Sequence, residues 1–188
     1  MMKIGITGSL ASGKTTASKI LSYKRGPLFS ADTAVEKLYK NKKFKSLIIK
    51  KFKIENKYNI KKSLKKLIIK NIKNLEKLEK IIHPHVRKKM LKFTSRNKNR
   101  KKLFYEIPLL IESKLMKFFD VVIFIKSKKE LRLKRFKAKR GDKKLFNLLN
   151  KKQMSDENKI KFCDYVVVNE KNLKILKKNL LSIMTQYE

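Results

Sequence analysis

Residues 8–15 read GSLASGKT, and their types and spacing suit the binding of a phosphate group. Gly8 and Gly13 allow a tight turn that brings several backbone N–H groups toward one point, where the positive end of a following helix strengthens an anion site. Lys14 is placed to reach the β- and γ-phosphates of a nucleotide, and the Thr15 hydroxyl is placed to ligate Mg²⁺. The stretch therefore predicts a nucleotide site that works with a magnesium ion.

The elements on either side of this stretch decide whether it is a phosphate loop or a chance match in a lysine-rich chain. Residues 3–7 (KIGIT) predict a buried strand that runs directly into the loop. Helical spacing of apolar residues from Thr15 to about Ser22 predicts a helix that follows it. This context favours a true nucleotide site, and we expect its residues to be Gly8, Ala11, Ser12, Gly13, Lys14, Thr15 and Thr16.

An acidic residue after the second predicted strand suggests what the phosphate is transferred to. The chain has no Asn-Lys-x-Asp sequence of the kind that switch GTPases use to bind guanine, so transfer to a small molecule is the better interpretation. Residues 27–32 (PLFSAD) predict a strand that ends in Asp32, where ligands gather in open parallel sheets. We expect Asp32 to accept or orient the proton of an acceptor hydroxyl. The alternative is an N-cap of the helix that begins near Thr33.

A basic segment later in the chain predicts a lid that excludes water from the reaction. Arg132, Arg135 and Arg140 lie in one helical pattern, and Gly141 follows as a candidate hinge. Arginines on such a lid can neutralise the charge that spreads over a transferring phosphoryl group. The alternative is a basic face that is merely solvated.

The remaining pattern indicates a parallel sheet that is covered by helices on both faces, which defines an α/β fold. The further strands are expected at 102–108, 120–126 and 165–169, and the helices between and after them at 128–140, 143–153 and 171–186. Residues 42–99 contain no good strand pattern and are predicted to form a very basic helical insertion.

Composition restricts the class of protein without choosing a substrate. The formal net charge is +37, yet only seven of the 52 basic residues are arginines, and the lysines are spread over the whole chain. Because base readout favours arginine, a solvated lysine-coated surface explains the charge better than a specific nucleic-acid partner. No apolar run approaches the roughly 20 residues of a membrane span, and the single Cys163 suits a reducing cytoplasm.

Five stretches resemble landmarks of the dephospho-CoA kinase family, and they occur in the family's order. They are the loop GITGSLASGKTT, SAD at 30–32, HPHVR at 83–87, PLLIES at 108–113 and CDYVVVN at 163–169. Between the last two, LRLKR and KKQMSDENK resemble the family's lid region. Phosphate loops occur in many families, whereas HPxxR and PLLxE at these spacings are far more particular.

The resemblance implies a P-loop kinase with a three-layer α/β/α core, a helical substrate domain and a lid. Such a kinase uses ATP and Mg²⁺ to phosphorylate the ribose 3′-hydroxyl of dephospho-CoA, the last step of coenzyme A biosynthesis. Asp32 matches the family's catalytic aspartate. His83 and Arg87 match its substrate-side motif, and Arg135 and Arg140 fall near its lid arginines. The implied single domain has a core at 1–41, 100–131 and 163–188, an insertion at about 42–99 and a lid at about 132–162.

Physical reasoning on these residues leaves some alternatives open. For His83 the alternative is a ring that is merely packed, beside a proline that can break a helix. Arg87, one helical turn on, is placed to bind a ligand phosphate through two N–H groups. Glu106 could position magnesium-bound water on the substrate side, or be a buried acid satisfied by backbone donors. Asn169 could touch adenine or cap the next helix.

The sequence also departs from the family's pattern. Ser9 and Ala11 stand where the family's loop has further glycines, and Ser30 replaces the first acid of its Asp-Ala-Asp motif. Lysines replace a glycine-bearing turn and an arginine between residues 52 and 64, and an arginine expected shortly before Gln153 is missing. Because lysine lacks the forked guanidinium, we expect these changes to affect turnover and the affinity for the substrate.

Two rival functions remain at the level of sequence. Another small P-loop kinase, for nucleoside monophosphates or shikimate, would share the loop, the lid and the position of Asp32. A nucleic-acid-binding protein would explain the charge, but the chain has no RRM, KH or zinc signature. We therefore expect dephospho-CoA as the partner molecule, no specific nucleic acid, no membrane, and a monomer or weak homo-oligomer.

Overall fold

The computed structural model describes residues 1–55 and 59–187, and it divides into two compact units. One unit consists of Met1–Ser30 and Phe93–Glu188 and is called the sheet unit here. The other consists of Ala31–Lys92 and is called the helical unit. The predicted boundaries of core, insertion and lid stay predictions, and residues 56–58 of the predicted insertion lie outside the described residues.

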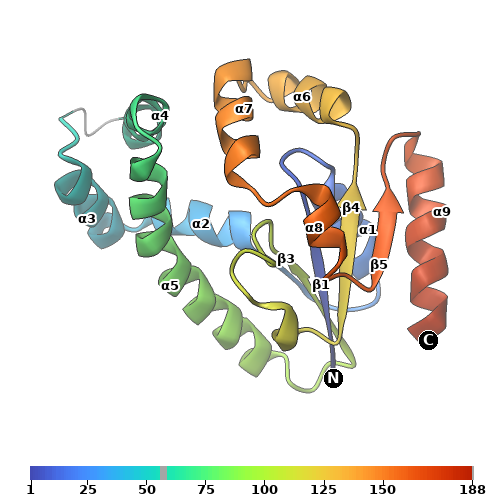
Figure 1. Cartoon of the computed structure of the whole chain (residues 1–188). Coiled ribbons are helices and arrows are strands. Elements are labelled where there is room, and N and C mark those ends of the chain that lie inside the picture. Colours follow the sequence, from blue (N-terminus) through green and yellow to red (C-terminus); the bar gives the residue numbers. More distant parts are fainter. Residues whose placement is uncertain (56–58, 188) are drawn as a thin grey trace. The chain divides into compact units, whose positions relative to one another are not determined.

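The sheet unit is built on five strands that all run parallel, which confirms the predicted α/β fold (Figure 1). Their spatial order is β2-β3-β1-β4-β5. The β1 strand therefore lies in the middle of the sheet, where a loop at its carboxyl end meets groups from strands on both sides. The strands are β1 (Met2–Gly8), β2 (Leu28–Ser30), β3 (Lys102–Glu106), β4 (Val121–Lys126) and β5 (Tyr165–Val168).

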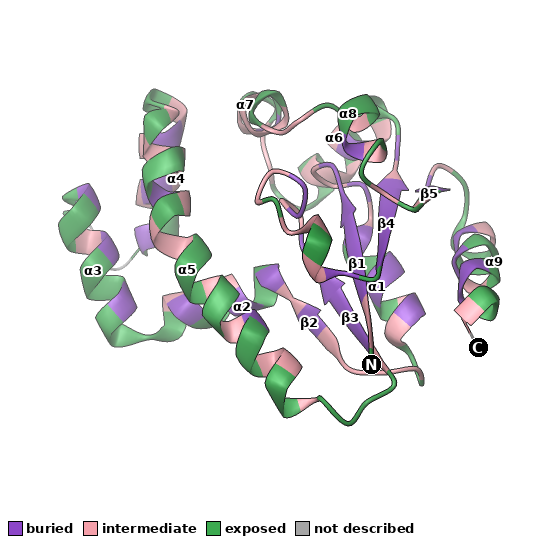
Figure 2. Ribbon diagram, turned by 60° about the horizontal axis from the view of Figure 1, so that its bottom comes forward, coloured by how far each residue is buried: buried purple, intermediate pink, exposed green. Residues whose placement is uncertain are grey.

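One face of the sheet packs against α1 (Lys14–Ser22) and α9 (Leu173–Met184), and this contact forms the aliphatic core. Figure 2 shows that the central strands are buried along most of their length. Such apolar strands are typical of parallel sheets, which are covered on both faces. The buried side chains of this core include Ile4, Ile6, Ala17, Leu21, Ile123, Val167, Leu176 and Leu180.

The opposite face of the sheet is covered by aromatic rings that gather around Tyr105 of β3. Phe93, Phe118 and Phe119 each contact the Tyr105 ring edge-on, with centroids 5.3–5.8 Å apart. Phe29 of β2 joins the group at a tilted angle. The Tyr105 hydroxyl shares a 2.8 Å hydrogen bond with Thr94, so its polar tip is satisfied while the ring is buried.

Three helices follow β4 in the region predicted as the lid: α6 (Lys129–Ala138), α7 (Lys143–Lys152) and α8 (Asp156–Ile160). Figure 1 shows α6 and α7 beyond the carboxyl end of β4. Gly141, predicted as a hinge, lies against the Phe136 ring, and a Cβ atom there would be 2.2 Å from it. The packing of the Phe136 ring therefore explains why a glycine stands at this position. Two short 3₁₀ turns, η2 (Met116–Phe118) and η3 (Thr185–Tyr187), complete the described elements of the sheet unit.

The helical unit holds α2 (Ala31–Lys40), α3 (Lys42–Phe52), α4 (Ile60–Lys70) and most of α5 (Lys73–Arg96). Phe44 packs edge-on against both Tyr39 and His85, which joins α2, α3 and α5. No strand occurs among the described residues between 42 and 99, as the sequence predicts. Pro84 lies inside α5 and does not end the helix, so the alternative of a helix break at this proline is wrong.

The second strand is shorter than predicted. It ends at Ser30, and Asp32 lies in the first turn of α2, so this residue is neither the last of a strand nor a cap before Thr33. An acid in the first turn of a helix is favourable, because the N–H groups there carry a partial positive charge. Asp32 still follows the carboxyl end of β2 by only two positions.

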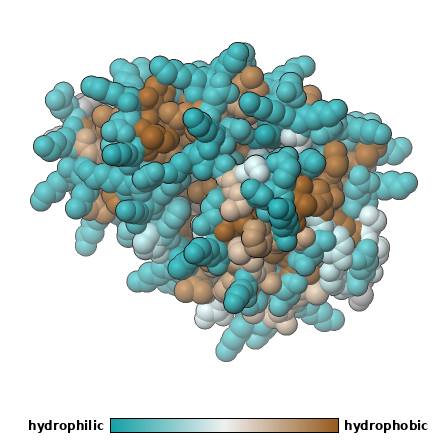
Figure 3. Space-filling view, viewed as in Figure 1, coloured by the Kyte–Doolittle hydropathy of each residue, from teal (hydrophilic) through white to brown (hydrophobic). Residues whose placement is uncertain are grey.

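Hydrophilic side chains cover most of the face seen in Figure 3, in keeping with 52 basic residues in the chain. Within the described residues, every helix is too short or too polar to cross a bilayer.

Candidate functional site

The glycine-rich loop lies between β1 and α1, at the carboxyl end of the central strand. Gly8 and Gly13 have φ angles of +150° and +100°, in the region that favours glycine. At Gly13 there is also no room for a side chain, because a Cβ atom would lie 2.1 Å from Nδ2 of Asn169. Both glycines are therefore required by the loop's conformation, as the sequence predicts.

Side-chain cations and amides bind the carbonyl groups of this loop. Nζ of Lys14 donates to the carbonyls of Gly8 and Ser9, at 3.0 and 2.9 Å. The carbonyl of Ser12 accepts from Nδ2 of Asn169 at 2.8 Å and from Arg135 at 3.3 Å. Because the N–H of a planar peptide points away from its carbonyl, the two contacts on the Ser12 carbonyl turn the N–H of Gly13 to the other side. An anion is the natural ligand for such a surface.

A buried carboxylate lies beside the hydroxyl that was predicted to bind Mg²⁺. Thr15 Oγ1 donates to Oε1 of Glu106 at 2.5 Å, and Ser18 Oγ donates to Oε2 at 3.5 Å. Glu106 is the last residue of β3 and pairs with Ile6 of β1, which brings it next to the loop. Its side chain is satisfied by hydroxyl groups, so the alternative of a buried acid held by backbone donors is wrong.

The two predicted lid arginines lie in different surroundings. Arg135, on α6, is half-buried and donates to the carbonyls of Ser12 and Asn169 and to the Ser127 hydroxyl. Arg140 follows α6, has a φ of +61° and is exposed. Arg135 is thus part of the support of the phosphate loop, whereas Arg140 has its guanidinium in solvent.

Other arginine and asparagine side chains act as structural links. Arg132 is buried, and it donates to the Ser127 carbonyl at 3.1 Å and to the Asn150 side chain at 2.7 Å, so it joins α6 to α7. Asn169 does not cap α9, because Asn172 performs that role with its side chain on the N–H of Ile175. The capping alternative for Asn169 is therefore wrong.

The other predicted loop residues differ in exposure. Ala11 adopts a φ of +60°, which is costly for a residue with a side chain. Ser12 is buried, and its hydroxyl has no hydrogen-bond partner among the residues that the structure describes. Thr16 is exposed at the start of α1, where the N–H groups of the first turn are available to an anion.

The predicted substrate-side residues lie in the helical unit. Asp32 is exposed on the first turn of α2, and His83 and Arg87 are exposed one turn apart on α5. The exposure of His83 contradicts the alternative of a packed ring. Within this unit, the neighbouring His85 instead makes the ring contact, with Phe44.

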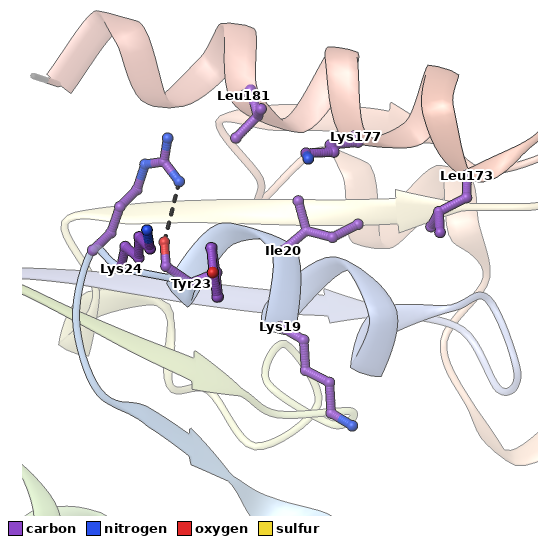
Figure 4. A pocket seen from close by; sticks show the side chains of 8 residues that line it. Lys19, Ile20, Tyr23, Lys24, Leu173, Lys177 and Leu181 are labelled. Carbon is purple, nitrogen blue, oxygen red and sulfur yellow. Dashed lines mark hydrogen bonds between the residues drawn. The ribbon is translucent and has the colours of Figure 1, made fainter.

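A groove of about 720 Å³ lies between α1 and α9 (Figure 4). Ile20, Leu173 and Leu181 give it an apolar floor, and the Arg25 guanidinium is held at its edge by the Tyr23 carbonyl. No residue of the phosphate loop lines this groove, so its size does not mark the nucleotide site.

Sequence reasoning did not anticipate five side chains that support the site. Gln153 and Asp156 contact the loop directly, Ser127 accepts a hydrogen bond from Arg135, and Glu112 forms an ion pair with Lys159. PLLIES and KKQMSDENK contain four of these five residues, so the family resemblance marked their neighbourhood without giving them a role.

The chain is similar to known proteins along its whole length. The sequence model of a family described as dephospho-CoA kinase matches residues 2–174. The chain belongs to the dephospho-CoA kinase family. Dephospho-CoA kinase of Rickettsia bellii is 34% identical over 189 residues, with 100% of this chain and 98% of the relative covered. That of Bartonella henselae is 35% identical, with 98% and 97% covered.

A solved structure shows that the fold is shared as well. The crystal structure of TT1252 from Thermus thermophilus matches with a TM-score of 0.79 and 25% identity, and covers 100% of this chain and 98% of its own. As a member of the dephospho-CoA kinase family, the chain transfers a phosphoryl group from ATP to dephospho-CoA in coenzyme A biosynthesis. This result confirms the predicted family and reaction.

Proposed function

We propose a division of roles for this reaction in which the sheet unit binds Mg-ATP and the helical unit supplies the acceptor side. The phosphate loop carries the proposal. Its Ser12 carbonyl is bound by Asn169 and Arg135, so the N–H of Gly13 points to the other side, where it is available to the triphosphate. Thr16 adds an N–H in the first turn of α1, and Asn169 stays close to the nucleotide through its contact with the loop.

Lys14 has a second role once ATP is bound. In this structure its ammonium is hydrogen-bonded to the loop's own carbonyls, which holds it next to the proposed phosphate position. We infer that it turns to the β- and γ-phosphates, where its charge stabilises the transferring group. Little covalent chemistry is required of the protein, because positioning and charge supply most of the catalysis of phosphoryl transfer.

The residues at the loop fit a magnesium ion. The Thr15 hydroxyl and the Glu106 carboxylate offer hard oxygen donors 2.5 Å apart, the ligand type that Mg²⁺ prefers. Thr15 would hold the ion directly, and Glu106 would hold it or one of its waters. When bound, the ion neutralises the charge on the β- and γ-phosphates. The described residues contain no cluster of three or more acids, histidines or cysteines, so phosphates and waters would complete the coordination.

Asp32 is the proposed general base. Its exposed carboxylate accepts the proton of the ribose 3′-hydroxyl as the oxygen–phosphorus bond forms, and the bond from phosphorus to the ADP oxygen breaks. Support comes from its match to the family's aspartate and from its position two residues after β2. Ser30, the partner of Glu106 in the β2–β3 pair, leaves Asp32 as the only acid of its motif.

We assign substrate binding to His83 and Arg87 of the helical unit. Both side chains are exposed on α5, so they are available to a polar or phosphate-bearing ligand. Arg140, also exposed, is the better candidate of the two lid arginines for a direct contact with the transferring phosphoryl group. We propose further that the enzyme acts in the cytoplasm as a monomer or weak homo-oligomer, without a specific nucleic-acid partner.

One experiment tests the proposed reaction directly. Purified protein is incubated with Mg-ATP and dephospho-CoA, and 3′-phosphorylated product and ADP are measured by mass. We expect product only when all three components are present, and no comparable ADP release with AMP, CMP or shikimate. Equal turnover of one of these acceptors would overturn the assignment of the acceptor.

A further inference from the structure

The side chain of Ser127 lies where a helix cap is expected, and it performs another task. A serine just before a helix commonly accepts a hydrogen bond from an N–H of the first turn. The N-cap residue of α6 is Lys128, whose side chain makes no capping hydrogen bond. The buried Ser127 hydroxyl instead accepts a 3.0 Å hydrogen bond from Nη1 of Arg135, eight residues along the chain. Its oxygen therefore holds an arginine in place.

The same serine binds a second arginine through its backbone. Nε of Arg132 donates to the Ser127 carbonyl at 3.1 Å, and Nη1 of Arg132 donates to Asn150 of α7 at 2.7 Å. Ser127 thus binds two arginines of α6, one with its carbonyl and one with its hydroxyl. Removal of the hydroxyl alone would release Arg135 and leave the contact with Arg132 intact, so mutation can separate the two contacts.

Arg135 connects Ser127 with the loops that follow β1 and β5. Its Nη2 donates to the Asn169 carbonyl at 2.9 Å, and its Nη1 donates to the Ser12 carbonyl at 3.3 Å. The side-chain amide of Asn169 donates to the same Ser12 carbonyl at 2.8 Å. Because the guanidinium group is planar and rigid, its three contacts together fix one orientation. The Ser12 carbonyl is therefore bound by two donors, one of which depends on Ser127.

The peptide between Ser12 and Gly13 is the part of the loop that these contacts orient. The N–H of Gly13 points away from the Ser12 carbonyl. The hydrogen-bond ladder of α1 begins with the Ala17 N–H on the Gly13 carbonyl at 3.1 Å, so it does not use the N–H groups of Thr15 and Thr16. The Gly13 N–H extends this set of donors by one. A charged donor on the Ser12 carbonyl also polarises the peptide, which makes the Gly13 N–H a stronger donor.

We propose that Ser127 is a positioning residue for the binding of the nucleotide phosphates. Its hydroxyl keeps Arg135 on the Ser12 carbonyl, and Arg135 in turn directs the Gly13 N–H to the phosphates and strengthens it as a donor. The helix α6, predicted as part of a lid, then belongs to the nucleotide site through Arg135. The proposal rests on the proposed role of the phosphate loop.

Removal of the Ser127 hydroxyl tests this role. In Ser127→Ala the carbonyl that binds Arg132 remains, and the contact with Arg135 is lost. We expect the Kd for a non-hydrolysable Mg-ATP analogue to rise about fivefold, and the KM for dephospho-CoA to stay within about twofold. Thr94→Val is the matched control, because it removes a hydroxyl that is hydrogen-bonded to Tyr105 among the aromatic rings of the sheet unit. It should lower stability and leave the nucleotide Kd unchanged.

Tripolyphosphate separates an effect on the phosphates from an effect on the base. It carries the phosphate chain of ATP without adenosine, so the Kd for Mg-tripolyphosphate should rise in Ser127→Ala by the same factor. Arg135→Lys keeps the positive charge but cannot bridge three acceptors, and it should weaken both ligands at least as strongly. The double variant Ser127→Ala, Arg135→Lys should bind no more weakly than Arg135→Lys, because the hydroxyl acts through this arginine.

Several results would overturn the proposal. One is an unchanged Kd for both ligands in Ser127→Ala, and another is a loss confined to the Mg-ATP analogue, which would assign Ser127 to the base. A third is full additivity in the double variant. If Ser127→Ala does not fold, Ser127→Cys replaces it, because sulfur is a weak acceptor of similar size to the hydroxyl. A failure of Lys14→Ala to weaken either ligand would instead refute the role of the phosphate loop, which distinguishes the two ideas.

Discussion

The Thr15 hydroxyl donates a 2.5 Å hydrogen bond to Oε1 of Glu106, although 91 residues separate them in the sequence. The bond exists because β3 pairs with β1, and Glu106 therefore ends beside the first turn of α1. A hydroxyl and a buried carboxylate at this position are the two oxygen donors on which the proposed magnesium site rests.

Glu106→Gln should separate the charge of this carboxylate from its hydrogen bond. The amide oxygen still accepts from Thr15, but the negative charge that favours a cation is lost. We expect kcat to fall about 100-fold and the Mg²⁺ concentration needed for half-maximal rate to rise, with ATP binding in the absence of metal unchanged. Glu130→Gln, an exposed acid on α6, is the control. An unaltered dependence on Mg²⁺ would refute the metal role of Glu106.

Asp32→Asn should act on rate and leave the nucleotide site intact. The amide cannot take the proton of the acceptor hydroxyl, so kcat should fall by about 100-fold or more. The Kd for Mg-ATP should stay within about twofold, because Asp32 lies on the helical unit and the loop is held by other residues. Single-turnover rates and direct nucleotide binding measure the two quantities. If ATP binding alone is weakened, Asp32 is not the base.

Arg135 and Arg140 should respond differently to removal. Arg135→Ala deletes hydrogen bonds to two carbonyls and one hydroxyl, so the unfolding free energy should fall by about 2 kcal/mol and nucleotide affinity should drop as well. Arg140→Ala removes an exposed side chain and should lower kcat with almost no change in stability. Chemical denaturation and steady-state kinetics provide the comparison. If Arg135→Ala lowered only kcat and Arg140→Ala lowered the unfolding free energy, the two arginines would have the opposite roles.

Ala11→Gly should relieve strain in the phosphate loop. Ala11 has a φ of +60°, where a side chain costs about 1–2 kcal/mol, while the greater freedom of glycine in the unfolded chain offsets up to about 1 kcal/mol of the gain. We expect a net stabilisation of up to about 1 kcal/mol in thermal unfolding, with turnover retained. A clear loss of stability would show that the Ala11 methyl group makes contacts that outweigh the strain.

Cys163 should make stability fall at alkaline pH. Burial, helped by the charge of Asp164, raises the pKa of this thiol from 9.0 to about 12, and its Sγ donates to the Lys159 carbonyl. Between these two values the unfolded chain loses the proton while the folded chain keeps it, so the unfolded state gains stability as pH rises. The unfolding free energy of the wild type should therefore decline relative to Cys163→Ala from pH 9 to 11. A constant difference between the two proteins would contradict the raised pKa.

The sequence predicts the parts of the site that are local. The loop, the strand before it and the helix after it lie within the first 22 residues, and each follows from glycine conformations and apolar spacing. The parallel sheet was predictable for the same reason, because its apolar strands are distinct segments. The reaction itself was predicted from the family resemblance, because single motifs do not specify it.

The supporting contacts were not predictable, because they join residues that are far apart in the chain. Nothing near Gln153 indicates that its side chain binds the Leu10 N–H, and nothing near Arg135 indicates three bonds in place of a mobile guanidinium. Gly141 illustrates the same limit. From the sequence alone, a glycine that leaves room for the Phe136 ring cannot be distinguished from a glycine that serves as a hinge. The prediction that Asp32 ends the second strand is wrong, because β2 ends at Ser30.

The hydrogen bond from Asn169 to the Ser12 carbonyl spans 157 residues, and it has a consequence for how the enzyme is made. A ribosome synthesises the glycine loop 157 residues before it adds the amide that binds Ser12. A nascent chain that stops before residue 169 can form the early strands but lacks this hydrogen bond to the nucleotide loop. ATP affinity should therefore arise abruptly during synthesis, when β5 joins the sheet.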